Sequence, residues 1–337
     1  MASEGFTPVA CSSGAWNGSG RAARGWSVRL RRERLWLHIL LFLLTAFTTT
    51  FVGARLFENF YYNRPAFNLL QDFPAYVDLF AHPTRWLWGL PFSVTLLTIL
   101  LAHEMGHYCM SRRYGIPTTL PYFIPLPLPP FGTFGAIIKM KGIIINKKAL
   151  FDIGVAGPLA SFVLSVPCAL IGIKLSTVVA IDANSDYIRL GDPLLFKLIQ
   201  WILIGELPPG HDIILHPLAY AGWVGLFVTA LNLLPVGQLD GGHVIYAVFG
   251  DKSKWAFGAS LTALILLAIF YNPGWLALIV LLLIFGMRHP QPFDAETPLD
   301  TGRKILACLM LLVFILSFMP SPFLGLSLFG SKGGVPA

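Results

Sequence analysis

Long apolar runs constrain the fold of this chain more than any other feature. The main runs cover about residues 35–52, 86–109, 151–173, 218–234, 255–271, 275–285 and 305–318 of the 337. A helix satisfies its own backbone hydrogen bonds, and about 20 apolar residues in a helix cross the hydrocarbon core. We therefore predict an all-α polytopic membrane protein with about six to seven transmembrane helices, of which the short run at 275–285 is tilted or incomplete.

The composition agrees with this prediction. The chain is 55% hydrophobic and 12% charged, with a mean hydropathy of +0.68, whereas soluble domains carry about twice that charged fraction. The net charge is +7, but no basic stripe alternates with exposed aromatic residues, so we expect a lipid bilayer and no nucleic acid as the partner. The four cysteines include no Cys-x-x-Cys pair, which argues against a disulfide framework or a thiolate zinc site.

The first 34 residues differ from the rest of the chain. They are polar, with Ser, Gly and Ala early and Arg late. This arm is disordered or lies on the membrane surface, or it is an organelle transit peptide, because transit peptides are also rich in Ser and Arg and poor in acids. We divide the chain into the arm at 1–34, a transmembrane domain at 35–320 with its core at 86–250, and a tail at 321–337.

Positive charge beside the runs predicts which of their ends face the same side of the membrane. Beyond the arm, the lysines and arginines beside the runs that we assign to one side are Arg112, Arg113, Lys139, Lys141, Lys147, Lys148, Lys252, Lys254, Arg288, Arg303 and Lys304. If each apolar run crosses the membrane once, these positions all fall on the same side. We therefore predict that they lie inside and that the C-terminus lies outside.

Residues 115–149 interrupt the apolar pattern. The six prolines between positions 117 and 130 exclude a regular helix there. The β-branched stretch at 136–145 predicts one or two short strands. We expect a re-entrant or surface β-hairpin directly after the second apolar run.

A His-Glu-x-x-His motif at His103, Glu104 and His107 lies near the end of the second run. The spacing of four places both imidazoles on one helix face, where both can bind one zinc ion. Glu104 points to the side, where it can take a proton from a zinc-bound water. Ionisable groups at membrane depth are costly and usually functional, which argues against a merely polar helix face.

The third ligand must come from another segment, since a catalytic zinc usually has three protein ligands. Asp240 ends an apolar run at the same predicted depth, and Pro235 and Gly237 would unwind the helix before it. The alternative is that Asp240 caps a short helix that begins at Gly241. His243 is a rival third ligand. Two imidazoles and a carboxylate suit zinc best among the metals.

These motifs together resemble the site-2 protease family of intramembrane zinc metalloproteases, in its bacterial and plastid-like branch. The likeness includes Asn-x-x-Pro-x-x-x-Leu-Asp-Gly-Gly at 232–242, Gly-Thr-Phe-Gly-Ala at 132–136 and Ala-Gly-Pro-Leu-Ala at 156–160. It covers about residues 86–250. The resemblance implies that His103, His107 and Asp240 hold Zn²⁺ and that Glu104 is the general base.

The resemblance also implies roles toward the substrate. Asn232 would hydrogen-bond the substrate or the tetrahedral intermediate, with an interhelical hydrogen bond as the alternative. The segment after the prolines would offer a strand edge to a locally unwound substrate. The substrate-binding residues would then be Gly132, Thr133, Phe134 and Gly135.

The expected reaction is hydrolysis of a peptide bond within or near a transmembrane segment of a membrane-protein substrate. No insertion between the runs is large enough for a PDZ domain, so we expect none. We favour the bacterial cytoplasmic membrane, with the active site toward the cytoplasm, over an organelle membrane. The alternatives are a metal-binding transporter, which gives Glu104 no task, and a non-proteolytic client-binding relative, which should have lost Glu104 or a ligand.

Overall fold

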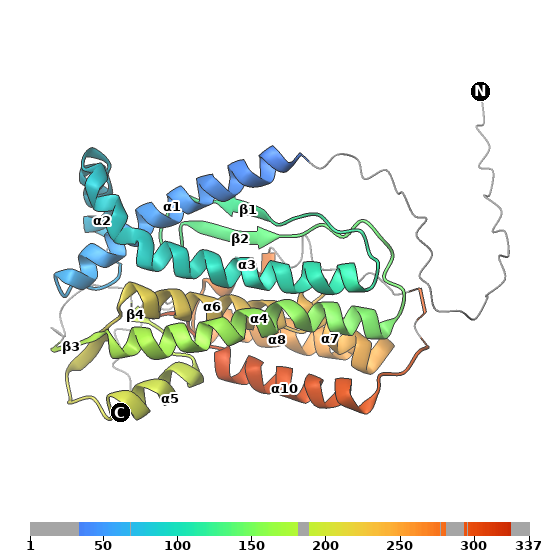
Figure 1. The fold of residues 1–337 in the computed structure, drawn as a ribbon. Helices are drawn as coiled ribbons and strands as arrows, with labels where there is room; N and C mark the ends of the chain where they lie inside the picture. Colours follow the sequence, from blue (N-terminus) through green and yellow to red (C-terminus); the bar gives the residue numbers. More distant parts are fainter. Residues whose placement is uncertain are drawn as a thin grey trace, which may run out of the picture. The chain divides into compact units, whose positions relative to one another are not determined.

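Helices dominate the computed structural model, which describes residues 34–67, 69–180, 189–276, 278–280, 293–294 and 296–324 (Figure 1). The α-helices are α1 (Leu35–Tyr61), α2 (Leu69–Ala81), α3 (Leu90–Arg113), α4 (Lys147–Lys174), α5 (Leu194–Leu203), α6 (Pro217–Leu233), α7 (Asp240–Phe249), α8 (Ser253–Phe270) and α10 (Thr301–Ser317). Two 3₁₀ helices, η1 (Pro83–Gly89) and η2 (Gly250–Lys252), join their neighbours. The predicted arm at 1–34, apart from Arg34, and residues 325–337 of the predicted tail lie outside the described residues.

Four helical segments in the described part of the chain are long and apolar enough to cross a membrane. They are Leu35–Tyr61, Pro83–Arg113, Lys147–Lys174 and Asp240–Phe270. Helices α5 and α6 are apolar but shorter. The predicted membrane protein is therefore supported, but the predicted count of six to seven spans is not established. Most of the run at 275–285 lies outside the described residues.

Helix α4 packs against both α3 and α6, and its first half contacts α7 (Figure 1). It begins where the Asn146 side chain accepts a hydrogen bond from the Ala149 N–H at 2.9 Å, as an N-cap residue does. Helix α6 is buried on most of its surface, and its Tyr220 and Trp223 are almost fully buried. A helix that is apolar all round belongs in an interior. This packing brings three helices together around α4.

The predicted β-hairpin follows α3. Strands β1 (Tyr122–Pro125) and β2 (Thr133–Ile137) pair antiparallel and lie beside α1 and α3 (Figure 1). The strands begin earlier than the β-branched pattern predicted, because the proline-rich segment itself supplies β1. Residues 138–145 form no named strand in the structure, but Met140 bridges Thr118, and the carbonyls of Ile144 and Ile145 accept from the N–H groups of residues 293 and 294. Proline is compatible with a short edge strand.

Two segments between the predicted apolar runs contain regular structure. Residues 55–85 hold the end of α1, α2 and η1. The buried Arg55 on α1 binds Asp72 on α2 at 3.0 Å, which fixes the second helix against the first. Residues 174–216 hold α5 and the pair β3 (Thr177–Ala180) and β5 (His211–Ile214). A third pair joins β4 (Arg189–Leu190) to β6 (Phe323–Leu324).

Candidate metal centre

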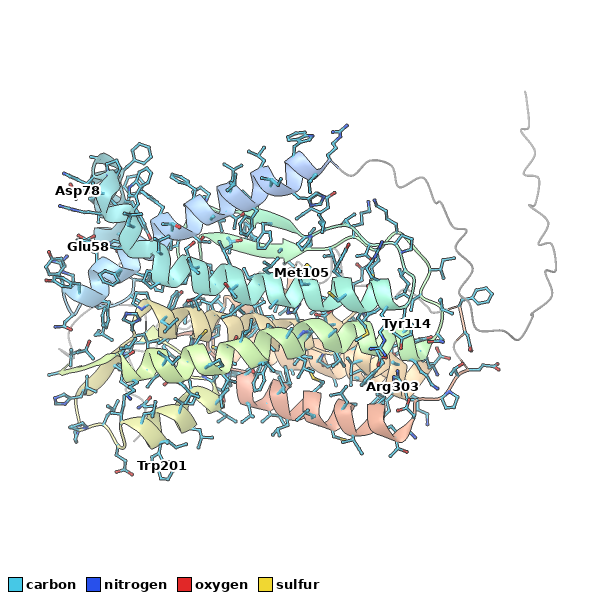
Figure 2. All side chains as sticks on the ribbon, viewed as in Figure 1. Glu58, Asp78, Met105, Tyr114, Trp201 and Arg303 are labelled. Atoms are coloured by element: carbon cyan, nitrogen blue, oxygen red, sulfur yellow. The ribbon has the colours of Figure 1, made fainter. Side chains whose placement is uncertain are left out.

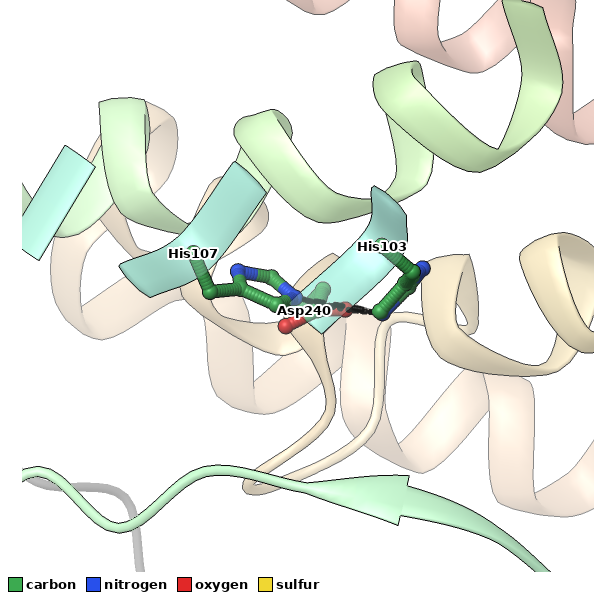
Figure 3. Close-up of side chains that lie close together, drawn as sticks. All are labelled: His103, His107 and Asp240. Carbon is green, nitrogen blue, oxygen red and sulfur yellow. Dashed lines mark hydrogen bonds and ion pairs between the residues drawn. The ribbon is translucent and has the colours of Figure 1, made fainter. Parts of the chain in front are cut away.

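Helix α3 presents the two predicted imidazole ligands side by side. His103 and His107 are both buried, and their Nε2 atoms lie 3.1 Å apart. Figure 3 shows the two rings converging on the carboxylate of Asp240, which comes from a different segment. Asp240 Oδ2 lies 3.3 Å from His103 Nε2 and 3.2 Å from His107 Nε2. The structure therefore brings together the three residues that the sequence singled out.

The turn after α6 carries Asp240 to this place. Helix α6 ends at Leu233, and α7 begins at Asp240 itself. A Cβ on Gly241 would lie 2.0 Å from the Leu233 carbonyl oxygen, so only glycine lets the first turn of α7 fold back onto the end of α6. Leu239 is the N-cap and makes no side-chain cap hydrogen bond. This geometry favours the ligand role of Asp240 over the helix-capping alternative.

The donor atoms have the separations that a tetrahedral ion requires. With metal–ligand distances near 2.0–2.1 Å, two ligand atoms of a tetrahedral zinc site lie about 3.3 Å apart. The three separations among His103, His107 and Asp240 are 3.1–3.3 Å. Two imidazoles and one carboxylate also form a typical catalytic donor set, with one position left for water or substrate. The residues present therefore fit a zinc ion.

Hydrogen bonds from α4 hold the outer edges of both rings. His107 Nδ1 lies 2.7 Å from the Ile153 carbonyl oxygen. Since a carbonyl can only accept, His107 carries its proton on Nδ1 and directs a lone pair from Nε2 toward the centre. His103 Nδ1 lies 3.2 Å from the Ser161 hydroxyl. Neither of these α4 contacts was predicted from the sequence as part of the site.

The predicted base and the predicted polar neighbour both lie next to this centre. Glu104 is buried on α3, and its carboxylate lies near the backbone of Ile138, directly after β2. The end of the β-hairpin therefore lies beside the predicted base. Asn232, near the end of α6, has its side-chain nitrogen 3.1 Å from His103 Nε2. Asn232 thus faces the centre, as the motif suggested.

The rival ligand His243 stands apart from the group. It lies on α7 one turn beyond Asp240, and its Cβ packs near Gly154 of α4. Within the part of the chain that the structure describes, the donor atoms within 4.8 Å of one another come from His103, His107 and Asp240. The geometry therefore favours Asp240 as the third ligand.

The predicted substrate segment divides into a fixed half and an open half. The Thr48 hydroxyl donates to the Gly132 carbonyl at 2.7 Å, and the buried Thr133 hydroxyl donates to the Ile124 carbonyl at 2.9 Å. Phe134, by contrast, is 74% exposed, and no atom of the described residues lies within 4 Å of a Cβ built on Gly135. Their role in substrate binding stays a prediction.

Comparison with known proteins places this centre in a family. Residues 91–270 match the family model described as Peptidase family M50. The matched region contains both metal motifs and the hairpin between them. The chain belongs to Peptidase family M50. The resemblance to the site-2 proteases is confirmed.

Plant proteins are among the curated relatives of this M50 chain. It is 34% identical over 239 residues to "Probable zinc metalloprotease EGY1, chloroplastic" of Arabidopsis thaliana, covering 69% of this chain and 43% of that protein. It is 32% identical over 239 residues to "Probable zinc metalloprotease EGY2, chloroplastic" of the same plant, covering 70% and 42%. The chain thus spans less than half the length of these relatives. Their names give no support to the expected bacterial cytoplasmic membrane.

Proposed function

We propose that this M50 chain is an intramembrane zinc metalloprotease, which hydrolyses a peptide bond within or near a transmembrane segment of a membrane-protein substrate. The observation that carries the proposal is the set of donor atoms on His103, His107 and Asp240, whose separations suit tetrahedral zinc. The names of the plant relatives, which describe zinc metalloproteases, support the same metal and reaction.

His103, His107 and Asp240 would hold the zinc ion. When bound, zinc supplies a Lewis acid that polarises the scissile carbonyl and lowers the pKa of water toward neutrality. Glu104 then accepts a proton from the attacking water and passes it to the amine that leaves when the peptide C–N bond breaks. Asn232 faces the same space and donates a hydrogen bond to the developing oxyanion.

The hairpin would receive the substrate. A transmembrane helix hides its peptide bonds in its own hydrogen bonds, so it must unwind locally before hydrolysis. Among the described residues, β2 pairs only with β1, so its other edge can pair with an unwound segment. Glu104 lies near the backbone of Ile138, so the end of this edge is close to the base.

The relatives also bear on location. Both are named chloroplastic, so we favour an organelle membrane of the plastid type over the bacterial cytoplasmic membrane. The basic residues at the C-terminal end of α3 and at the start of α4 support a metal centre that lies toward the positively charged side of the membrane.

Replacing the base tests the proposed reaction. The full chain is reconstituted in liposomes with a labelled synthetic transmembrane peptide that has a helix-breaking Asn-Pro-Gly centre. Glu104→Gln should keep the zinc content of the wild type and lower the cleavage rate about 10²–10⁴-fold, because proton transfer by the carboxylate is lost. Glu206→Gln, at an exposed glutamate outside the site, is the matched control.

Two results would count against the proposal. Cleavage by Glu104→Gln at the wild-type rate would remove Glu104 from the reaction. Zinc flux across the liposomes without peptide cleavage would favour the transporter alternative.

A further inference from the structure

One face of α4 carries three residues that have the same four-residue spacing as the two histidines on α3. Ile153, Gly157 and Ser161 are spaced by four residues, as are His103 and His107. Ile153 and Ser161 contact the outer nitrogens of the two rings. Between them, a Cβ on Gly157 would lie 2.1 Å from His107 Nε2. One face of α4 therefore forms the wall against which both imidazoles rest.

The wall continues into α6 through a pair of hydroxyl groups. Ser161 Oγ lies 3.2 Å from His103 Nδ1 and 2.8 Å from Thr229 Oγ1. Thr229 Oγ1 in turn donates to the Gly225 carbonyl oxygen at 2.7 Å. Ser161 and Thr229 are both almost fully buried, so no bulk water competes for these bonds.

The available protons indicate which group donates and which accepts in this series of hydrogen bonds. The Gly225 carbonyl can only accept, so the single Thr229 proton goes to it, and Thr229 Oγ1 can accept from Ser161. The Ser161 proton then has acceptors in Thr229 Oγ1 at 2.8 Å and the Pro158 carbonyl at 3.1 Å. With its own proton used in either way, Ser161 Oγ is an acceptor toward His103. This arrangement favours a proton on His103 Nδ1, which leaves the Nε2 lone pair toward Asp240 and His107.

We propose that Ser161 and Thr229 are positioning residues that fix the tautomer and the ring orientation of His103 for metal binding. This inference rests on the proposed zinc site and deepens it, since the hydroxyl pair does for His103 what the Ile153 carbonyl does for His107. Outer partners of ligating histidines typically change metal affinity by about 10–100-fold when they are removed. Neither residue touches the substrate or the reacting atoms in this arrangement.

A purely structural role predicts a different pattern, and Ser165 supplies the comparison. Ser165 lies one turn beyond Ser161 on α4 and is equally buried. Its hydroxyl donates to the Ser161 carbonyl at 2.7 Å. Ser165→Ala thus removes the same atoms from the same helix without removing the hydroxyl that meets His103.

The test measures zinc binding by the purified full chain through competition with a chelator, without any substrate. Ser161→Ala should weaken zinc affinity by about 10–100-fold, while Ser165→Ala should bind zinc as the wild type does. Thr229→Val keeps the shape of threonine but not its hydroxyl, so it removes the shorter of the two bonds that orient the Ser161 hydroxyl. Its zinc affinity should therefore fall between those of the wild type and Ser161→Ala. Thr229→Ser keeps the hydroxyl and should bind like the wild type.

The outcomes separate this inference from the proposed function. If Ser161→Ala and Ser165→Ala bind zinc equally well, the positioning role is wrong while the zinc site stands. If Ser161→Ala does not fold, the two variants at Thr229 provide the test. Equal zinc affinities of Thr229→Val and Thr229→Ser would then overturn the inference. If the wild type itself binds no zinc, the proposed function fails and this inference fails with it.

Discussion

Single residues on α4 set the room available to the ligands. Gly157 packs so closely on His107 that a methyl group would lie 2.1 Å from Nε2, 2.6 Å from Cδ2 and 2.6 Å from Cε1 of the ring. These distances are far below van der Waals contact, and the clash falls on the nitrogen that faces the other donors. The ring would have to turn away from His103 and Asp240.

Gly157→Ala should therefore lose most of the bound zinc, with the membrane helices still formed. The control is Gly258→Ala on α8, where nothing described lies within 4 Å of the new Cβ and alanine favours the helix. Zinc content measured by mass spectrometry, with helix content by circular dichroism, distinguishes the two variants. A full zinc content in Gly157→Ala would show that His107 does not need its observed position.

Some residues of the metal centre were predictable from the sequence and others were not. His103 and His107 were predictable because four residues on one helix make one face. Asp240 was predictable only as one of two candidates, since its helix had to be placed against α3. Ser161 and Thr229 were not predicted, because their partners lie 58 and 68 residues away along the chain and only the tertiary packing brings them together.

Among the elements, the β-hairpin depends on a close fit to α1. Gly132 has φ +76, and a Cβ there would lie 2.8 Å from Thr49 Cα and 2.9 Å from the Thr48 carbonyl oxygen. The Thr48 hydroxyl donates to the Gly132 carbonyl at 2.7 Å. Gly132 therefore attaches the hairpin to α1 and leaves Phe134 and Gly135 open.

Gly132→Ala should push the hairpin off α1 and reduce peptide cleavage, with the zinc content unchanged. The control is Gly115→Ala, which has nearly the same φ of +70 but nothing described within 4 Å of the new Cβ. Both changes carry the same backbone cost of about 1–2 kcal/mol, so a difference in cleavage reports the packing. Equal cleavage by the two variants would mean that the contact with α1 does not position the hairpin.

A polar cluster joins α10 to the metal-bearing helices. Arg303 donates to Asp152 on α4 at 2.8 and 2.6 Å, and the Tyr114 hydroxyl after α3 donates to the same carboxylate at 2.5 Å. The hydrogen bond to Asp152 raises the pKa of Arg303 above its already high ordinary value. Figure 2 shows Tyr114 and Arg303 at one end of the helices, with Glu58 and Asp78 at the other.

Arg303→Met should lower the free energy of unfolding by about 2 kcal/mol, because a charge-assisted pair is lost while the Asp152 carboxylate stays partly buried. Lys304→Met, at the exposed neighbouring position, should have little effect. Unfolding of the purified protein in detergent with increasing denaturant measures both. A similar stability of the two variants would show that solvent screens the cluster.

The elements that the sequence missed share a physical cause. Helix α2 was not predicted, because its Pro74 and aromatic residues hide a helical pattern that the pair between Arg55 and Asp72 stabilises. Strand β1 was missed because its proline-rich sequence disfavours regular structure in isolation. In both cases a contact with α1 decides the outcome, and local sequence does not contain it.

For the whole molecule, composition was sufficient to predict a helical membrane protein. It was not sufficient to predict the number of membrane-spanning helices. The 17-residue α6 reads as a span by hydropathy, yet it is shorter than the four candidate spans and is covered by its neighbours. Burial by protein and burial by lipid favour the same apolar residues, so hydropathy alone does not distinguish them. The conclusion that α3 and the turn before α7 meet does not depend on the number of spans.

The zinc content of the purified full chain and of two single variants tests the meeting of these segments most directly. The account predicts one zinc ion per chain in the wild type, since three protein donors at these separations suit one ion. It predicts loss of that zinc in Asp240→Ala and retention in His243→Ala, one turn further on α7. Full zinc content in Asp240→Ala, or its loss only in His243→Ala, would contradict the account.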